Sequence, residues 1–174
     1  ALLEAMAERQ VTFGRQTFAL PDFFMVMATQ NPIEQEGTYA LPEAQLDRFL
    51  LHTVVDYPNR EAEQAILQLV REENAGQVST SQDIAPTLVS QAQIFQARQE
   101  VLALHMAEPV ERYLVEIVLA SRNPPANLAP LIELGASPRG TIGLALCARA
   151  HAWLAERDFV TPEDVQAIAH DVLR

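Results

Sequence analysis

FFMVMAT at residues 23–29 and FLLHTVV at residues 49–55 are the two apolar runs that decide the predicted fold of this chain. An unbroken apolar run of this length is typical of a strand covered on both faces. Residues 42–48, between the runs, predict a short helix, and a helix crossing between two buried strands indicates a parallel sheet. Two strands do not make such a sheet alone, so we expect its other strands to precede Ala1.

The residues before the first run predict a helix and a hairpin. Residues 1–6 read ALLEAM and carry no basic residue, a pattern of the middle of an amphipathic helix rather than of a signal peptide. We therefore expect the chain to begin inside a structural element. Residues 11–13 and 16–20 flank Gly14-Arg15, a pair suited to a two-residue turn, and this pattern predicts a β-hairpin.

Every element after Pro58 is predicted to be helical. In three segments, apolar residues recur at spacings of three and four, which places them on one face of a helix. The three segments are residues 62–70, 110–118 and 165–173, and further helices are predicted over residues 89–106 and 141–156.

The last helix has the clearest start signal. Thr161 has the side chain of an N-cap, and Pro162 suits the first helical position. Because helical patterns replace strand patterns near residue 58, we expect a domain boundary there. The predicted domains are an α/β part at residues 1–58 and an all-helical bundle at residues 59–174.

Composition excludes several classes of function. The net charge is -11 and the isoelectric point is near 4.7, so nonspecific nucleic-acid binding is disfavoured. All 12 basic residues are arginines, which excludes any chemistry that needs a lysine from this chain. Schiff-base formation and the phosphate-binding lysine of a P-loop are both excluded in this way.

The remaining reactive residue types point to no metal or disulfide chemistry. Cys147 is the single cysteine and cannot form an intramolecular disulfide. The four histidines lack the spacing of metal ligands, so no metal site is predicted. No stretch approaches the ~18 apolar residues of a membrane span. We therefore expect a cytoplasmic protein without a membrane span.

Asn31 is the first candidate for a chemical role. It follows the first apolar run in ATQNP at residues 28–32. The carboxyl ends of parallel strands face the ligand crevice, where an amide can orient water or contact a phosphate oxygen. The alternative is an ordinary Asn-Pro turn, which the position alone favours.

Arg48 is the second candidate, at the end of the short helix before the second run. An arginine offered by a neighbouring subunit can stabilise charge on a phosphoryl group during its transfer. The alternatives are an ion pair with Asp47 or Glu43, or a cation favourably placed at a helix C-terminus.

Arg139 is the third candidate, within GASPRGT at residues 135–141. This segment runs into a helix that either Ser137 or Thr141 could cap. A cation in the first turn opposes the helix dipole, so the position of Arg139 makes more sense if its side chain meets an anion.

Taken together, these segments resemble the MoxR family of AAA+ ATPases. Their order and spacing are specific in combination, although residues 76–107 resemble only a helical lid. The resemblance implies an α/β fragment of a P-loop NTPase (AAA+) core followed by an all-α helical lid bundle. The stretches that carry it are LLEAMAERQVT (2–12), ATQNPIEQEGTY (28–39), LPEAQLDRF (41–49), GASPRG (135–140) and VTPEDV (160–165).

The resemblance also implies roles for individual residues. Asn31 is similar to sensor 1, Arg48 to the arginine finger and Arg139 to sensor 2, acting on the ATP of its own subunit or of its neighbour. The hairpin around Gly14 resembles the pre-sensor-1 insertion. The family's Walker A and Walker B segments, which hold ATP and Mg²⁺, precede its counterpart of the opening helix. We therefore expect these 174 residues alone to be inactive.

The function implied by the resemblance is ATP-driven, chaperone-like remodelling of client proteins or insertion of their cofactors. Such proteins usually form hexameric rings and work with von Willebrand factor A domain partners. One alternative is a nonenzymatic helical module that docks a partner through exposed apolar stripes. Another is a magnesium-chelatase-like AAA+ subunit.

Overall fold

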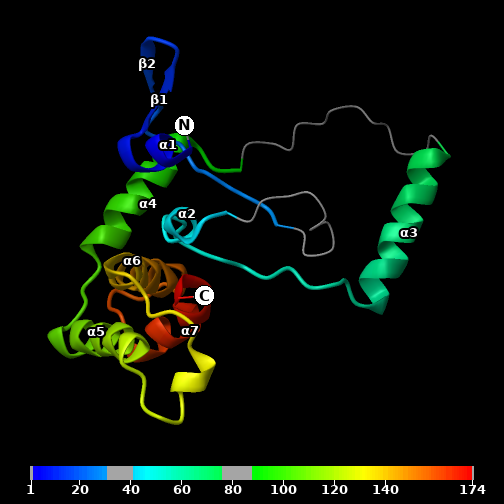
Figure 1. Cartoon of the computed structure of the whole chain (residues 1–174). Coiled ribbons are helices and arrows are strands. Elements are labelled where there is room, and N and C mark those ends of the chain that lie inside the picture. Colours follow the sequence, from blue (N-terminus) through cyan, green and yellow to red (C-terminus); the bar gives the residue numbers. More distant parts are fainter. Residues whose placement is uncertain (1, 31–40, 76–87, 174) are drawn as a thin grey trace. The chain divides into compact units, whose positions relative to one another are not determined.

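The computed structural model describes residues 2–30, 41–75 and 88–173, and it divides into two units (Figure 1). One unit comprises residues 1–52 with residues 97–174, and the other comprises residues 53–96. The elements in chain order are α1 (Leu2–Glu8), β1 (Gln10–Phe13), β2 (Gln16–Ala19), α2 (Glu43–Leu46), α3 (Arg60–Asn74), α4 (Gln91–Ala103), α5 (Glu108–Arg122), the 3-10 helix η2 (Ala129–Leu131), α6 (Pro138–Leu154) and α7 (Pro162–Leu173).

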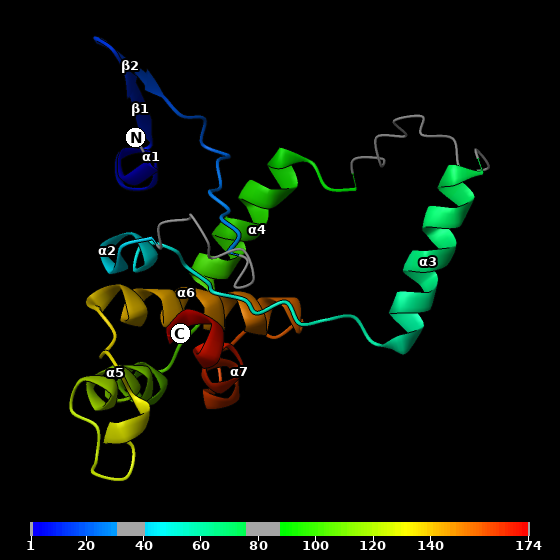
Figure 2. The ribbon, with the colours of Figure 1, turned by 45° about the vertical axis from the view of Figure 1, so that its right-hand side comes forward.

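The hydrophobic core of the first unit lies between α5, α6 and α7, which pack side by side (Figure 2). Val118 of α5, Leu144 of α6 and Val165 of α7 are its largest fully buried apolar side chains. The apolar stripe predicted on α5 is confirmed, because Val110 and Leu114 are buried beside Val118. Burying such side chains stabilises the fold by about 1.5–3 kcal/mol each.

Two glycines allow α6 and α7 to approach closely. A Cβ atom at Gly140 would lie 3.0 Å from Cδ2 of Leu173, and one at Gly143 would lie 3.0 Å from Cγ1 of Val172. Both separations are tighter than ordinary van der Waals contact. Glycine is unfavourable inside a helix, and here the close packing of α7 explains its presence.

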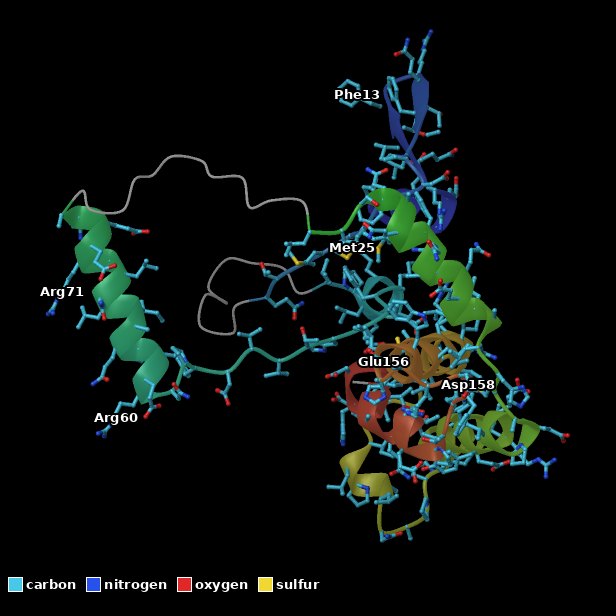
Figure 3. All side chains as sticks on the ribbon, turned by 180° about the vertical axis from the view of Figure 1, so that it is seen from behind. Phe13, Met25, Arg60, Arg71, Glu156 and Asp158 are labelled. Atoms are coloured by element: carbon cyan, nitrogen blue, oxygen red, sulfur yellow. The ribbon has the colours of Figure 1, made fainter. Side chains whose placement is uncertain are left out.

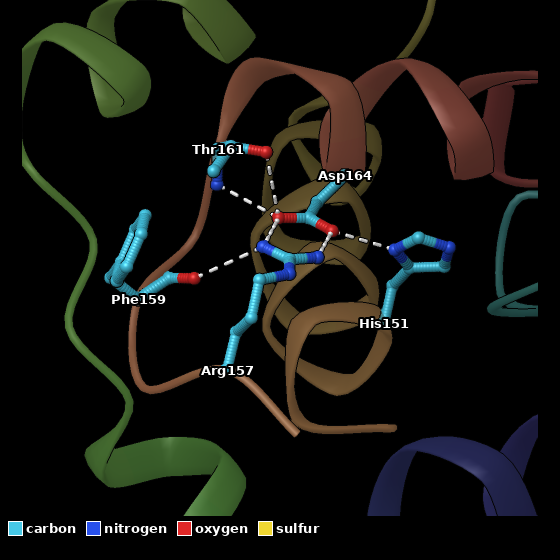
Figure 4. Close-up of polar contacts among 5 residues, drawn as sticks. All are labelled: His151, Arg157, Phe159, Thr161 and Asp164. Carbon is cyan, nitrogen blue, oxygen red and sulfur yellow. Dashed lines mark hydrogen bonds and ion pairs between the residues drawn. The ribbon is translucent and has the colours of Figure 1, made fainter. Parts of the chain in front are cut away.

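A buried carboxylate fixes the turn between α6 and α7 (Figure 4). Asp164 is only 1% exposed and accepts hydrogen bonds from both terminal nitrogens of Arg157. It also accepts from the backbone N–H of Thr161 at 2.8 Å, and its Oδ1 lies 2.7 Å from Nδ1 of His151. Because a buried carboxylate is costly unless it is paired, this network defines how the chain reverses.

The same contacts lower the pKa of Asp164 far below its ordinary value of 3.8. The hydrogen bonds from Arg157 are the largest cause, and they outweigh the opposing effect of burial. The helix begins at Pro162, directly after Thr161, as the sequence predicts. Thr161, the predicted N-cap of α7, therefore also belongs to the hydrogen-bond network of Asp164.

The hairpin is confirmed as predicted. β1 and β2 pair antiparallel with Phe13 opposite Gln16, so Gly14-Arg15 forms a two-residue turn. Gly14 has a φ of 64°, a left-handed conformation that glycine adopts without strain. Phe13 projects from the hairpin and is 83% exposed (Figure 3).

The prediction of two buried parallel strands is wrong for the described chain. Residues 23–29 and 49–55 form neither helix nor strand, and their apolar side chains are largely exposed, as Met25 and Val55 illustrate. A strand needs a neighbour for its backbone N–H and C=O groups. Among the described residues, the β1–β2 pair is the only sheet.

The helical predictions hold with shifted boundaries. α3 covers the stripe predicted at residues 62–70, but none of its residues is buried. α4 lies inside the range predicted at residues 89–106. α6 begins at residue 138 rather than 141, because the chain is already capped before Pro138. No helix within the described ranges is long and apolar enough to cross a membrane.

We predict that Asp164→Ala lowers the free energy of unfolding by about 2–4 kcal/mol, because it leaves Arg157 and Thr161 without their buried partner. Chemical denaturation at neutral pH measures the change. The lowered pKa adds a pH signature: the contribution of Asp164 is complete above pH 3.8 and is lost as the pH falls further.

The neighbouring exposed Glu163 provides a matched control. Glu163→Gln removes a carboxylate from the same helical turn, and it is expected to change stability far less than Asp164→Ala because Glu163 is exposed to solvent. Equal effects of the two substitutions would contradict the role assigned to the Asp164 network.

Candidate functional site

The candidate site is built on the start of α6. Ser137 is the N-cap of this helix, and its hydroxyl oxygen accepts a hydrogen bond from the backbone N–H of Arg139 at 3.1 Å. Pro138 fills the first helical position, where a missing N–H costs nothing. Of the two caps that the sequence allows, Ser137 is therefore the one used, and Thr141 lies inside the helix.

The loop before α6 is held against the end of α5. The hydroxyl of Ser121 accepts from the backbone N–H of Ala136 at 3.0 Å, and Nε of Arg122 donates to the Ala136 carbonyl at 2.8 Å. A Cβ atom at Gly135 would lie 2.8 Å from the Cα of Arg122, so only glycine fits this approach. The position of Arg139 is thus fixed from both sides, by α5 and by the helix cap.

Arg139 meets an anion, as its unfavourable place in the helix dipole predicts. Its Nη1 lies 2.7 Å from Oδ2 of Asp47, a residue 92 positions earlier in the chain. The Arg139 side chain remains 53% exposed, which leaves donors of the guanidinium open to solvent. The anion that Arg139 meets is therefore a carboxylate of the same chain. The exposed nitrogens of its guanidinium could donate to a second anion.

The pKa of Asp47 reflects this environment. Burial raises it, but hydrogen bonds from Ser137 and Arg139 and the charges of Arg139 and Arg48 together hold the pKa below its ordinary value. The carboxylate lies at the positive end of the α6 dipole, where negative charge is favoured. Asp47 is therefore ionised at neutral pH and bound to the first turn of α6.

Arg48 is the next residue after Asp47. The Arg48 side chain makes no ion pair within the described ranges. The alternative of a pair with Asp47 or Glu43 is not observed there, because Asp47 pairs with Arg139 instead. Nε of Arg48 is a buried polar atom without a hydrogen-bond partner among the described residues. A buried, unsatisfied guanidinium nitrogen is costly, so this atom calls for an acceptor that the described residues do not supply.

The residues after Arg48 run along α6 and α7. The backbone N–H of His52 donates to the carbonyl of Asp171 at 2.7 Å. A Cβ atom at Gly143 would lie 3.5 Å from Cδ1 of Leu50, so this leucine packs on the α6 backbone. Together with the Asp47–Arg139 pair, these contacts bind residues 47–52 to α6 and α7. This segment is called the finger segment, after the role that the family resemblance implies for Arg48.

The structure brings together two of the three predicted site residues. Arg48 and Arg139 are linked through Asp47, whereas Asn31 lies outside the described residues. Asp47 is the residue of this cluster that sequence reasoning missed, since the sequence offers it only as a local partner for Arg48. Cys147 is a buried thiol whose pKa is raised by burial, in line with an inert core position.

Two protein-family models match the chain. Residues 1–51 match the model described as ATPase family associated with various cellular activities (AAA). Residues 126–174 match the AAA lid domain. The first match contains the finger segment up to Leu51, and the second contains all of α6 and α7. The two halves of the site therefore fall in the two family matches.

Similar proteins extend over nearly the whole chain. YeaC of Bacillus subtilis, an uncharacterized protein, is 44% identical over 169 residues, covering 97% of this chain and 49% of YeaC. The chaperone MoxR1 of Mycobacterium tuberculosis is 38% identical over 178 residues, covering 100% of this chain and 45% of MoxR1. The chain spans about half the length of these curated relatives.

A solved structure is similar to nearly the whole chain. The crystal structure of a candidate ATPase from Cytophaga hutchinsonii matches with a TM-score of 0.83 and 38% sequence identity. The match covers 99% of this chain and 52% of the other. The similarity therefore extends beyond the residues matched by the two family models.

We predict that Gly135→Ala lowers the free energy of unfolding by about 1–3 kcal/mol, since its methyl group would force the end of α5 to shift. Thermal or chemical unfolding measures the effect. The adjacent Leu134→Ala, at a position 68% exposed, serves as the control and is expected to change stability by less than about 0.5 kcal/mol. Unchanged stability of Gly135→Ala would show that the loop does not press on α5.

Proposed function

Because this chain belongs to the MoxR family of AAA+ ATPases, we propose that it uses Arg48 and Arg139 to couple ATP hydrolysis to the remodelling of client proteins. Its fold is that of a partial AAA+ core followed by a helical lid, as the sequence predicts. The division into residues 1–58 and 59–174 stays a prediction.

The residues of the site fit a bound nucleotide. Guanidinium groups bind phosphate oxygens through paired, charge-assisted hydrogen bonds, and the site holds two of them. Nε of Arg48 lacks a partner among the described residues, and Arg139 has donors open to solvent. The unsatisfied Nε of Arg48 is the observation that carries the proposal, because the guanidinium needs an acceptor that the described residues do not supply.

Each residue has a distinct proposed role. With Mg²⁺, ATP supplies the phosphoanhydride bond whose hydrolysis drives remodelling. Arg48 reaches the γ-phosphate site of the neighbouring subunit and stabilises charge there during hydrolysis. Arg139 binds phosphate from the lid, in its own or the adjacent subunit, and reports its presence to α6. Asn31 orients the attacking water, a role that rests on the family resemblance alone.

The wider setting is also part of the proposal. We expect a hexameric ring in the cytoplasm, working with a von Willebrand factor A domain protein on clients whose folding or cofactor insertion it promotes. The name of the chaperone MoxR1 supports client remodelling. A magnesium-chelatase-like role is the alternative within the same superfamily. The AAA match over residues 1–51 favours either ATPase over a nonenzymatic helical module.

The lysine-free composition limits what these residues do alone. The phosphate-binding lysine of a P-loop has no counterpart among the 174 residues. We therefore propose that ATP and Mg²⁺ are held mainly by a segment outside them. On this proposal, residues 1–174 alone do not hydrolyse ATP.

We predict that Arg48→Ala in the full-length ATPase lowers kcat for ATP hydrolysis on the order of 1000-fold, the effect typical of an arginine finger. The affinity for ATP, measured by titration with a fluorescent analogue, is expected to change little. The reason is that the finger acts on charge that develops during the transfer, whereas binding depends mainly on the subunit's own residues.

Arg112→Ala is the matched control, because Arg112 lies on α5 with a side chain 69% exposed. It removes one positive charge and is expected to leave both hydrolysis and binding unchanged. If Arg48→Ala weakened binding and hydrolysis by the same factor, Arg48 would be a binding residue and the finger assignment would fail.

A further inference from the structure

Asp47 links the two arginines of the site: it precedes Arg48 in the sequence, and its carboxylate pairs with Arg139. It is the C-cap of α2, with its backbone N–H bonded to the carbonyl of Glu43 at 2.9 Å. Its Cα lies one peptide unit, about 3.8 Å, from that of Arg48. Whatever fixes the Asp47 side chain therefore also limits where the Arg48 side chain begins.

The carboxylate of Asp47 is bound to a rigid element. Its partners, Ser137 and Arg139, belong to the cap and first turn of α6. The same helix contributes Leu144 and Ala148 to the core, both fully buried. The packing of α6 in the core therefore fixes the position of its first turn. Because Asp47 is bound to that turn, the end of α2 is held beside it.

Arg48 has no comparable contact of its own. Its backbone N–H is bonded to the carbonyl of Gln45 at 3.2 Å, which only completes the turn at the end of α2. Within the described ranges its side chain makes no ion pair, and its Nε lacks an acceptor. The position of the guanidinium therefore depends on the backbone on either side of it.

We propose that Asp47 is a positioning residue for ATP hydrolysis: by binding the first turn of α6, it places the adjacent Arg48 at the distance from Arg139 that the reaction requires. This inference rests on the proposed role of Arg48 as the finger. Asp47 touches no reacting atom and acts through Arg48. The lid and the finger segment then form one body, so a displacement of α6 carries Arg48 with it.

The size of the expected effect follows from geometry. A misplacement of about 1 Å in a reacting group lowers a rate by on the order of 100-fold. Loss of one exposed ion pair leaves the Leu50 and His52 contacts of the finger segment in place. We therefore expect a partial displacement of Arg48 and a fall in kcat of about tenfold.

The test uses Asp47→Asn and Asp47→Glu in the full-length ATPase at saturating ATP. Asp47→Asn keeps the size of the side chain and removes its charge, and it is expected to lower kcat about tenfold. Asp47→Glu keeps the charge and is expected to retain most of the activity. Thermal unfolding of both variants is expected to match the parent protein, because an exposed ion pair contributes little to stability.

Two comparisons make the test specific. In an Arg48→Ala background, Asp47→Asn is expected to cause no further fall in kcat, since the group that it positions is gone. Glu108→Gln is the matched control: it breaks an exposed carboxylate–arginine pair of 2.6 Å with Arg112 on α5, and kcat is expected to stay unchanged.

The outcomes separate the two proposals. If Arg48→Ala leaves kcat unchanged, the finger assignment itself fails. If Arg48→Ala abolishes hydrolysis while Asp47→Asn has full activity, only the positioning role fails. An equal tenfold fall from Asp47→Asn with and without Arg48 would also overturn the positioning role, because Asp47 would then act independently.

Discussion

The burial of one apolar seam between α5, α6 and α7 is the constraint on which the described site depends. Leu144 of α6 and Val165 of α7 are fully buried in it, and the glycines at 140 and 143 let the two helices meet at close range. Asp164 closes the turn between them through Arg157 and Thr161. With α6 held in this way, its N-terminus is fixed in place, and the Asp47 carboxylate is bound there by Ser137 and Arg139.

The position of the finger segment follows from the fixed start of α6. Asp47, Leu50 and His52 each contact α6 or α7, so a stretch that the family match assigns to the AAA core is bound to the lid. In this arrangement Arg48 directly follows a residue that is paired with Arg139. On the proposed function, a displacement of α6 would therefore move the backbone from which the Arg48 side chain extends.

Local signals in the sequence predict the elements that local physics determines. The stripe of Val110, Leu114 and Val118 marks α5, and the Gly14-Arg15 pair marks the hairpin turn, because helix periodicity and glycine conformation need no distant partner. The apolar runs at residues 23–29 and 49–55 predict strands, but a strand depends on neighbours for its hydrogen bonds. Of the site, Arg48 and Arg139 are predicted through family resemblance. The Asp47–Arg139 pair joins residues 92 positions apart, and no local pattern encodes it.

The most direct test of the central claim is a structure of the full-length ring with a nonhydrolysable ATP analogue. The account predicts that the Arg48 guanidinium lies within hydrogen-bond distance of the γ-phosphate held by the adjacent subunit, with Arg139 also at a phosphate. Placement of both arginines away from every bound nucleotide in an intact ring would contradict it.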